Sequence, residues 1–509
     1  MPLVRSYVRH LGRGLPSRLP VYAPAMVVAV VALVARLAPV LRGGGLTGVL
    51  AYDDGVYYSA SDALLSGRLP YRDYVLLHPP GITLVLAPFA AFGRIAGDSE
   101  GMATARVAFM LVGAMSAVLV WRIAGRVSPR AGLVAGLFYA VWQPAAYAER
   151  TTLLEPLVNL GLLGALALLG PGAGRRRIVA AGVVLGLAVA VKAWAVLPFL
   201  VLALWLLRRA GWRATLSYVG AGAAAAAVVC LPFLALAGPR MLRMVVLDQL
   251  GRPNNAVTTV DRLASIEALQ ISPGPMSARL ALIAVLLAGA AAVAVAALPW
   301  RRPATRVWVA LLAVAALLLL TSPSYFGHYG TFAAPALALV VGAGTDTVLS
   351  WLAVRAVVVG PLVPAVGLVA LAVLGAHIVT QPEGRRPPPE RAMADELAGA
   401  RCVAADSAAA LAVADVLTRD LRDGCPLVVD VTGLTYDQDR GDLTSGPTPA
   451  ARRRDGEWQR SVDRYLTGAN AVLLDQWRSE GLDPKVLTRL EHRDLELGRP
   501  SYRVFVAAS

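Results

Sequence analysis

Ala23–Leu41, with the sequence APAMVVAVVALVARLAPVL, is the stretch that decides the fold, and Ala51-Tyr-Asp-Asp-Gly55 follows it closely. The first segment is an apolar run long enough to cross a bilayer as a helix. A carboxylate held at the centre of a bilayer costs about 2.5–3.5 kcal/mol on insertion scales. Asp53 and Asp54 are therefore predicted to lie at or beyond the membrane surface, where a carboxylate can act as a general base or hold a cation.

The composition is that of a polytopic membrane protein. The 509 residues are 57% hydrophobic and have a mean hydropathy of +0.60, which excludes an ordinary soluble globule. The formal charge of +15 does not indicate nucleic-acid binding, because the arginines stand in short clusters between apolar runs, as in Arg175-Arg176-Arg177 and Arg301-Arg302. Such clusters are typical of cytoplasmic loops. Nearly all of the basic charge is Arg, a bias that favours a bacterial source.

About eleven membrane crossings are predicted. They lie at Ala23–Leu41 and at about 107–125, 131–147, 152–170, 178–191, 193–207, 215–237, 278–298, 307–321, 331–348 and 357–378. The shorter run Ile82–Ala96 is predicted to be an interfacial or re-entrant helix, because a crossing there would move the next Arg cluster to the outside. The basic N-terminus is expected in the cytoplasm. An odd number of crossings then places the C-terminus outside the bacterial plasma membrane.

The composition changes after residue 380. Residues 381–509 are predicted to form a small extracytoplasmic α/β domain behind a transmembrane module of residues 1–380, with a Pro- and charge-rich linker at 381–391. Strands are predicted at Arg401–Asp406, Pro426–Val431, Ala471–Asp475 and Tyr502–Ala508, and a helix at about 407–421. Cys402 and Cys425 stand at the starts of the first two strands. A disulfide between them is expected in an oxidising compartment, and two free thiols are the alternative.

The first long loop, about 42–106, gathers acidic, aromatic and cationic residues. Besides the acidic pair it contains Tyr71-Arg72-Asp73 and His78-Pro79-Pro80. Tyrosines at a membrane interface often form only an aromatic belt. A helix N-cap would explain one aspartate of the pair but not its neighbour.

This loop resembles the first extracytoplasmic loop of the GT-C superfamily of membrane glycosyltransferases, which includes protein O-mannosyltransferases and aminoarabinose transferases. The likeness rests on Asp53-Asp54 shortly after the first helix, on the two motifs above, and on Ala148-Glu149-Arg150 at the end of a later helix. In layout it covers roughly residues 20–380. It implies a polyprenyl-phosphate sugar donor, a carboxylate that deprotonates an acceptor hydroxyl, cations that stabilise the leaving phosphate, and inversion by direct displacement.

In that scheme Asp53 is the preferred base and Asp54 binds the acceptor or a cation, with the two roles open to exchange. Lys192 is the first candidate for the donor phosphate, because an isolated ammonium at an outer helix end needs an anionic partner. Snorkelling to the lipid headgroups is the alternative. The other predicted substrate-binding residues are Arg106, Arg72, Tyr71, His78, Arg150, Glu149, His328 and Tyr329.

Several of these residues also have a structural explanation. Arg106 and Arg150 could only anchor their helices, and a lone interfacial His328 could be structural. Glu149 and Glu155 could pair locally with Arg150.

The sequence thus predicts a membrane glycosyltransferase that moves a sugar from a polyprenyl phosphate to an extracytoplasmic glycan, lipid or protein. Metal use is left open by the sequence, since Asp53 and Asp54 could hold Mg²⁺, Mn²⁺ or Ca²⁺ and no other cofactor is predicted. Two rival hypotheses stay open: a lipid-linked sugar transporter or flippase, and a non-catalytic cell-wall assembly protein. A transporter would not need a large acidic and aromatic outer loop.

Overall fold

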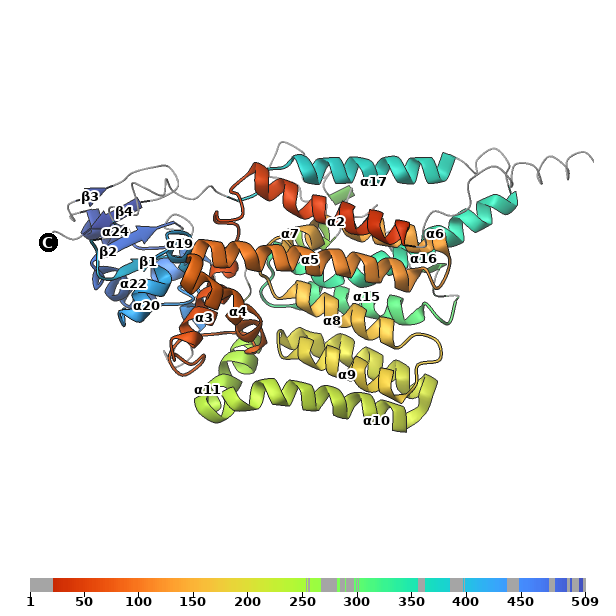
Figure 1. The fold of residues 1–509 in the computed structure, drawn as a ribbon, viewed down its shortest axis with the longest axis horizontal. Coiled ribbons are helices and arrows are strands. Elements are labelled where there is room, and N and C mark those ends of the chain that lie inside the picture. Colours follow the sequence, from red (N-terminus) through yellow and green to blue (C-terminus); the bar gives the residue numbers. More distant parts are fainter. Residues whose placement is uncertain are drawn as a thin grey trace, which may run out of the picture.

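The structure, a computed structural model, describes residues 22–252, 257–266, 302–355, 362–384, 399–436, 448–475 and 481–491, together with a few shorter stretches. A bundle of long helices occupies most of the molecule, and a small α/β part covers one end of it (Figure 1). The chain passes through the bundle first and enters the α/β part after residue 399.

The bundle end of the chain is almost entirely helical. Its helices are α2 (Ala23–Arg42), α3 (Tyr52–Leu65), α4 (Gly81–Ala96), α5 (Asp98–Ala124), α6 (Pro129–Ala140), α7 (Gln143–Ala148), α8 (Glu155–Leu168), α9 (Arg175–Val189), η1 (Ala193–Ala195), α10 (Val196–Ala237), α11 (Pro239–Leu242), η2 (Arg243–Leu247), α12 (Asp248–Leu250), α13 (Thr259–Ile266), α15 (Arg306–Thr321), η3 (Gly327–Ala333), α16 (Ala334–Arg355) and α17 (Leu362–Thr380).

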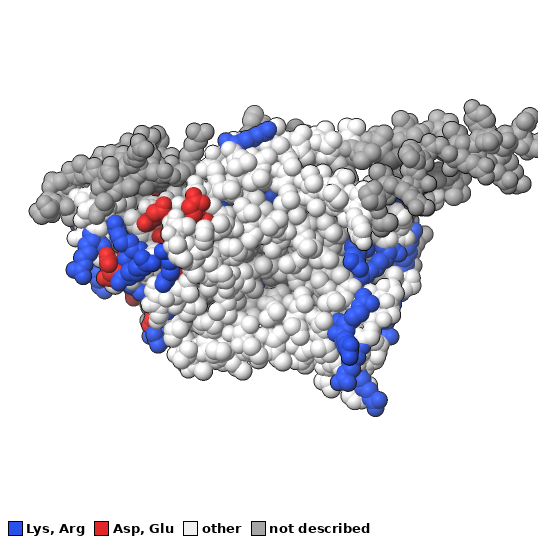
Figure 2. Space-filling model, in the orientation of Figure 1, with Lys and Arg blue, Asp and Glu red and all other residues white. Residues whose placement is uncertain are grey.

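Within the described residues, four stretches are long and apolar enough to cross a membrane: Ala23–Arg42, Asp98–Ala124, Ala193–Ala237 and Gly327–Trp351. Shorter apolar helices add to them: Gly81–Ala96, Glu155–Leu168, Arg306–Thr321 and Leu371–Thr380. Figure 2 shows a broad belt nearly free of charge between two charged ends of the molecule. The protein is therefore a multi-pass membrane protein. The total of eleven crossings and their orientation stay predictions, and the span predicted at 278–298 lies mostly outside the described residues.

The stretch Ala193–Ala237 contains two helical segments that fold back on each other. Gly211 in α10 has φ 80° and ψ 176°, a conformation that residues with a side chain rarely adopt. The Phe199 and Tyr218 rings on either side of it stack with centroids 4.6 Å apart. The Tyr218 hydroxyl also donates to the Phe199 carbonyl at 3.3 Å. The predicted spans 193–207 and 215–237 are thus separate segments, joined by a glycine turn.

The span predicted at 131–147 is wrong in one respect, because the helix breaks between α6 and α7. Pro144 has no N–H with which to continue the helical hydrogen bonds to the Ala140 carbonyl. That carbonyl accepts a hydrogen bond from Arg36 of α2 at 2.8 Å instead. A proline therefore opens the helix, and a buried arginine from a neighbouring helix satisfies the carbonyl that is left.

Helices α3 and α4 lie at the end of the bundle that the α/β part covers (Figure 1). They pack against each other, and α4 also packs along α5. Helix α4 corresponds to the predicted interfacial helix Ile82–Ala96. This arrangement places the helix that bears Asp53 and Asp54 between the bundle and the C-terminal part.

The C-terminal part contains a four-stranded sheet with the strand order β1-β2-β4-β3. The strands are β1 (Val403–Ala405), β2 (Ala471–Leu474), β3 (Leu495–Glu496) and β4 (Arg503–Val506). Strand β1 runs parallel to β2, with Val403 opposite Ala471, whereas β4 is antiparallel to both β2 and β3. The helices are α19 (Ala408–Val413), α20 (Leu417–Arg422), α21 (Pro449–Arg454), α22 (Gly456–Thr467) and α24 (Pro484–Glu491), with the short turn η4 (Gly433–Tyr436).

Two sequence predictions fail in this part. Residues 426–431 form no strand, and the parallel neighbour of β1 is β2. The predicted helix at 407–421 is divided into α19 and α20 at Asp415, whose φ is 56°. Its carboxylate accepts hydrogen bonds from the Ser99 amide at 2.8 Å and the Ser99 hydroxyl at 3.0 Å. The break in the helix therefore serves the contact with α5.

The junction between the C-terminal part and α3 is closely packed. A side chain at Gly55 would lie 2.2 Å from the Ala409 amide, so the backbones of α3 and α19 meet there. Thr418 of α20 donates from its hydroxyl to Asp98 at 2.6 Å and from its amide to the same carboxylate at 2.9 Å. One apolar core also continues from α3 and α4 into α19 and β1.

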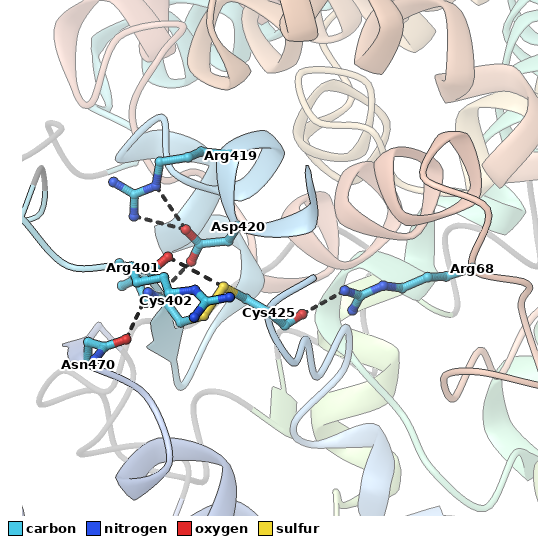
Figure 3. The surroundings of a disulfide bond; sticks show 8 residues. Arg68, Arg401, Cys402, Arg419, Asp420, Cys425 and Asn470 are labelled. Carbon is cyan, nitrogen blue, oxygen red and sulfur yellow. Dashed lines mark hydrogen bonds and ion pairs between the residues drawn. A yellow bond between two sulfur atoms is a disulfide. The ribbon is translucent and has the colours of Figure 1, made fainter. Parts of the chain in front are cut away.

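Cys402 and Cys425 form a disulfide bond, with their Cα atoms 5.6 Å apart (Figure 3). The Cys425 carbonyl accepts a hydrogen bond from Arg68 of the first loop at 2.6 Å. The disulfide thus fixes the start of β1 to the segment that leads from α20 toward α3. This segment continues to Asp430 and Thr432, which reach the site described next.

Candidate active site

A cavity of about 430 Å³ lies where α3, the first loop and the C-terminal part meet. Polar and charged side chains reach it from all three regions and from other parts of the bundle, among them Lys192, Arg252 and His328, and aromatic rings complete its wall. Its lining residues include Tyr52, Asp53, Tyr57, His78, Tyr147, Lys192, Arg252, Phe326, His328, Tyr329, Asp430, Thr432 and Arg452.

The two adjacent aspartates have different surroundings, because successive residues of a helix point about 100° apart. Asp54 is buried, with 1% of its surface exposed. It accepts hydrogen bonds from Arg106 Nε at 2.7 Å and from the Thr152 amide at 3.0 Å. Asp53 lines the cavity and has no hydrogen bond or ion pair with any residue that the structure describes. The cavity is therefore open to one carboxylate of the pair only.

The environment of Asp53 favours its protonated form. Helix α3 lies outside the candidate membrane spans. The pKa of Asp53 is raised from 3.8 to about 7, first by burial and then by the negative charges of Asp430 and Glu155, while Arg252 and Lys192 act to lower it. A carboxylate with a pKa near 7 can take up a proton at neutral pH, as a general base must.

Arg106 was predicted to bind substrate, but it does not line the cavity. Its Nε and Nη2 atoms donate to Asp54, and Nη1 donates to the carbonyls of Leu46 and Gly48. All three nitrogen atoms of this buried guanidinium thus donate to groups of the protein itself. The Asp54–Arg106 pair therefore joins α3 to α5, and Asp54 is unavailable to share a cation with Asp53.

Lys192 lies at the cavity, as predicted for a phosphate ligand, but it already has an anionic partner. Its Nζ atom pairs with Glu155 of α8. It also lies 4.4 Å from the Trp194 ring centroid and 4.5 Å from that of Tyr329, so two aromatic faces surround the ammonium. Glu155 was not predicted as its partner, and no feature of the sequence distinguishes it from a helix-end glutamate.

Glu149 and Arg150 do not face the cavity and do not pair with each other. Glu149 pairs with Arg36 of α2 and accepts a hydrogen bond from the Tyr139 hydroxyl at 2.6 Å. Arg150 pairs with Glu383 at 3.0 Å, beyond the end of α17. The local pairing of Glu149 and Glu155 with Arg150 is wrong, because each of these residues binds a partner far along the chain.

Arg72 and Tyr71 line a second cavity of about 320 Å³ instead of the first. Arg72 pairs with its neighbour Asp73 at 2.7 Å, and nearly half of its side chain is exposed. Tyr71 has a φ of 67°, and its hydroxyl donates to the His78 carbonyl at 2.7 Å. Tyr71 therefore supports the turn that carries His78, and Arg72 is not placed beside Lys192.

Three other predicted residues do reach the first cavity: His78, His328 and Tyr329. Burial holds the pKa of His78 well below its ordinary value, and the positive charges of Lys192 and Arg252 lower it further. His78 is therefore neutral at neutral pH and can exchange hydrogen bonds without adding charge. The rings of His328 and Tyr329 meet edge to face, with centroids 4.8 Å apart.

Sequence reasoning did not single out Arg252, Asp430, Thr432 or Arg452 for this cavity. Arg252 belongs to a charged loop in which single roles could not be assigned. Asp430 stands in the apolar run Val428-Val-Asp-Val431, which has the pattern of a strand. No signal in the sequence links that run to α3, because the contact forms only when the C-terminal part folds over the bundle.

The described residues contain no cluster of three or more His, Cys, Asp or Glu side chains that could hold a metal ion. Asp53 and Asp54 do not form a shared site either, since both oxygens of Asp54 accept hydrogen bonds from Arg106 and Thr152. A cation bound between the two carboxylates therefore does not fit this geometry.

Comparison with known proteins agrees with the predicted family resemblance. Residues 76–323 match the family model of Glycosyltransferase family 87. Undecaprenyl phosphate-alpha-4-amino-4-deoxy-L-arabinose arabinosyl transferases from two strains of Pseudomonas aeruginosa are 30% identical over 197 residues. That match covers 36% of this chain and only 35% of the length of these relatives.

Solved structures share the fold over nearly the whole chain. ArnT from Cupriavidus metallidurans bound to undecaprenyl phosphate has a TM-score of 0.57 and 14% identity, and the match covers 96% of this chain and 99% of that one. The oligosaccharyltransferase of Archaeoglobus fulgidus in complex with Zn and sulfate has a TM-score of 0.51 and 12% identity over 91% of this chain and 70% of that one. These structures have the same fold as this chain, and the match to the Glycosyltransferase family 87 model lies within the shared region.

Proposed function

We propose that the protein transfers a sugar from a polyprenyl phosphate to an acceptor hydroxyl, with Asp53 as the general base. The observation that carries this proposal is the pair of adjacent aspartates with opposite surroundings. Asp54 is fully engaged inside the protein, whereas Asp53 borders a cavity that also contains Lys192 and Arg252. A base and two cations in one enclosed space are what glycosyl transfer from a lipid phosphate requires.

In the proposed step the acceptor oxygen attacks the anomeric carbon of the donor sugar. The bond between that carbon and the phosphate oxygen breaks with its electron pair, which stays on the phosphate. The proton of the acceptor hydroxyl passes to Asp53, and the configuration at the anomeric carbon inverts. Lys192 and Arg252 stabilise the charge that develops on the phosphate, and Glu155 keeps Lys192 in place.

Asp54 has a positioning role in this proposal. Its ion pair with Arg106 and its bonds to Thr152 fix the first turn of α3 against α5 and the segment before α8. Since Asp53 stands on the same turn, these bonds set the direction of its carboxylate. In this proposal Asp53 thus accepts the proton, and Asp54 holds Asp53 in position.

The cavity is proposed to open on the extracytoplasmic side. The Cys402–Cys425 disulfide supports this orientation, because disulfides persist in oxidising compartments. The carrier lipid named for ArnT, undecaprenyl phosphate, is proposed as the donor carrier here. The acceptor is proposed to be a glycan, a lipid or a protein of the cell envelope.

Transfer assays test this function directly. Purified protein is supplied with radiolabelled undecaprenyl-phosphate sugars and a panel of octyl glycosides as acceptors. Wild type should form labelled product, and Asp53→Asn should reduce kcat by about 10²–10⁴-fold. Asp423→Asn, in an exposed aspartate of the C-terminal part, is the matched control and should keep the wild-type rate. Equal turnover by wild type and Asp53→Asn would refute the role of Asp53.

The same assay separates the enzyme from its rivals. A flippase moves intact donor across vesicles and forms no glycoside product. An assembly protein without catalytic function would bind acceptors equally well with and without Asp53. Addition of EDTA to the wild-type reaction tests metal use, and full activity in its presence would agree with the lack of a shared carboxylate site.

A further inference from the structure

A second carboxylate, Asp430, borders the cavity and comes from the C-terminal part. It belongs to the segment that runs from the disulfide toward α3. Its Oδ1 atom accepts three hydrogen bonds: from the Tyr52 hydroxyl at 3.1 Å, the Thr432 hydroxyl at 3.0 Å and the Gly433 amide at 2.7 Å. Tyr52 immediately precedes Asp53, so the two carboxylates are joined through one residue of α3.

The second oxygen of Asp430 is left available. Oδ2 accepts no hydrogen bond and Asp430 forms no ion pair in the part of the chain that the structure describes. The loop is also shaped around this atom, because a side chain at Gly433 would come within 2.2 Å of Oδ2. One oxygen is thus held by three donors and the other is kept clear, an arrangement typical of a carboxylate positioned for a ligand.

The charged groups around the cavity separate into those with partners and those without. Asp54 pairs with Arg106, and Glu155 pairs with Lys192. Asp53 and Asp430 are lining carboxylates without a cationic partner among the described residues. A half-buried carboxylate without a cationic partner is destabilised by the loss of its hydration, unless a ligand supplies hydrogen bonds.

Asp430 also lines the second cavity, so the two spaces share this residue as part of their wall. A ligand in either cavity can therefore reach Asp430.

We propose that Asp430 is an acceptor-positioning residue: its Oδ2 atom accepts a hydrogen bond from a second hydroxyl of the acceptor while Asp53 takes the proton from the reacting hydroxyl. This inference rests on the proposed glycosyl transfer. It assigns to the C-terminal part a direct role in holding the acceptor. It also requires an acceptor with at least two hydroxyl groups close together.

Steady-state kinetics of Asp430→Asn test the proposal. With octyl glycosides as probe acceptors, the acceptor KM should rise by about tenfold or more, the loss expected for a hydrogen bond to a charged group. The donor KM should stay unchanged, and Asp430→Glu should recover part of the acceptor affinity. With 1-octanol, which has a single hydroxyl, wild type and Asp430→Asn should transfer sugar at the same rate, measured at a pH high enough for Asp53 to be ionised in both proteins.

The pH profile gives a second readout that a purely structural residue would not change. Because the charge of Asp430 helps to raise the pKa of Asp53, Asp430→Asn should move the half-maximal pH of kcat/KM downward. Asp423→Asn removes an exposed charge from the same part of the chain and should leave the profile in place.

The outcomes are distinguishable from a failure of the proposed function. If wild type forms no glycoside with any donor, the function itself is wrong. If wild type is active and Asp53→Asn is not, two results overturn the role of Asp430. The first is an unchanged acceptor KM in Asp430→Asn, and the second is an equal loss with octyl glycosides and with 1-octanol.

Discussion

Replacement of Asp53 by Asn should make the protein more stable while it lowers kcat by about 10²–10⁴-fold. The carboxylate of Asp53 borders the cavity without a hydrogen bond or an ion pair in the described part of the chain. Its folded-state pKa of about 7 lies above the ordinary value of 3.8. The folded state is therefore destabilised by the charged form of Asp53. The neutral amide of Asn does not have this destabilising charge.

The magnitude follows from the shift. A rise of about three pKa units corresponds to roughly 4 kcal/mol at about 1.4 kcal/mol per unit. Asp53 borders a cavity that water can enter, so we expect about half of this, roughly 2 kcal/mol. The sign depends on pH: the cost is nearly absent below the unfolded pKa, grows as the pH rises, and is complete above the folded pKa. The advantage of Asp53→Asn should therefore increase between pH 5 and pH 8.

Unfolding of the purified protein in detergent at the two pH values measures this difference. Asp54→Asn is the matched control, since it makes the same chemical change one residue away. It leaves the buried Arg106 without its partner and should destabilise the protein by about 3–5 kcal/mol. The reasoning fails if Asp53→Asn is less stable than wild type at pH 8, or if its advantage is the same at both pH values.

Three other perturbations test separate parts of the site. Transfer by wild type should rise with pH to half its plateau near pH 7, because the pKa of Asp53 is about 7; a flat kcat/KM profile from pH 5 to 8 would contradict this. Lys192→Gln should raise the donor KM by about tenfold or more, with Lys192→Arg retaining part of the affinity, and an unchanged donor KM would remove Lys192 from the phosphate site. The double change Cys402→Ser and Cys425→Ser opens a disulfide with a sequence separation of 23. It should cost about 3 kcal/mol of stability, and wild type in reductant should then melt like the variant.

The parts of the fold that could be predicted are those in which neighbours in sequence determine the structure. Apolar runs of membrane length favour helices, and α2 and α15 agree with their predicted positions, whereas α5 begins at Asp98, nine residues before the predicted start at 107. The break between α6 and α7 was missed because it depends on a long-range contact. Pro144 weakens the helix locally, but Arg36 makes the break tolerable by satisfying the Ala140 carbonyl.

The candidate site shows the same limit. Asp53, Lys192 and His78 could be selected from their residue types and their places at helix ends, and all three reach the cavity. The partners of the charged residues could not be predicted. In the sequence, an arginine at the end of an apolar helix looks the same whether it binds a phosphate or a carboxylate. Arg106 is the clearest case, since only the folded chain reveals that Asp54 occupies it.

The contribution of Asp430, Thr432 and Arg452 to the cavity wall has a consequence for how the protein is made. Chains emerge from the ribosome starting at the N-terminus, and domains generally fold in that order. Asp53 is therefore synthesised long before the segment that completes its surroundings. We expect the nascent protein to be catalytically inactive until this last segment has packed against α3. A chain that ends at residue 400 should bind no acceptor, so incomplete copies would not consume the lipid-linked donor.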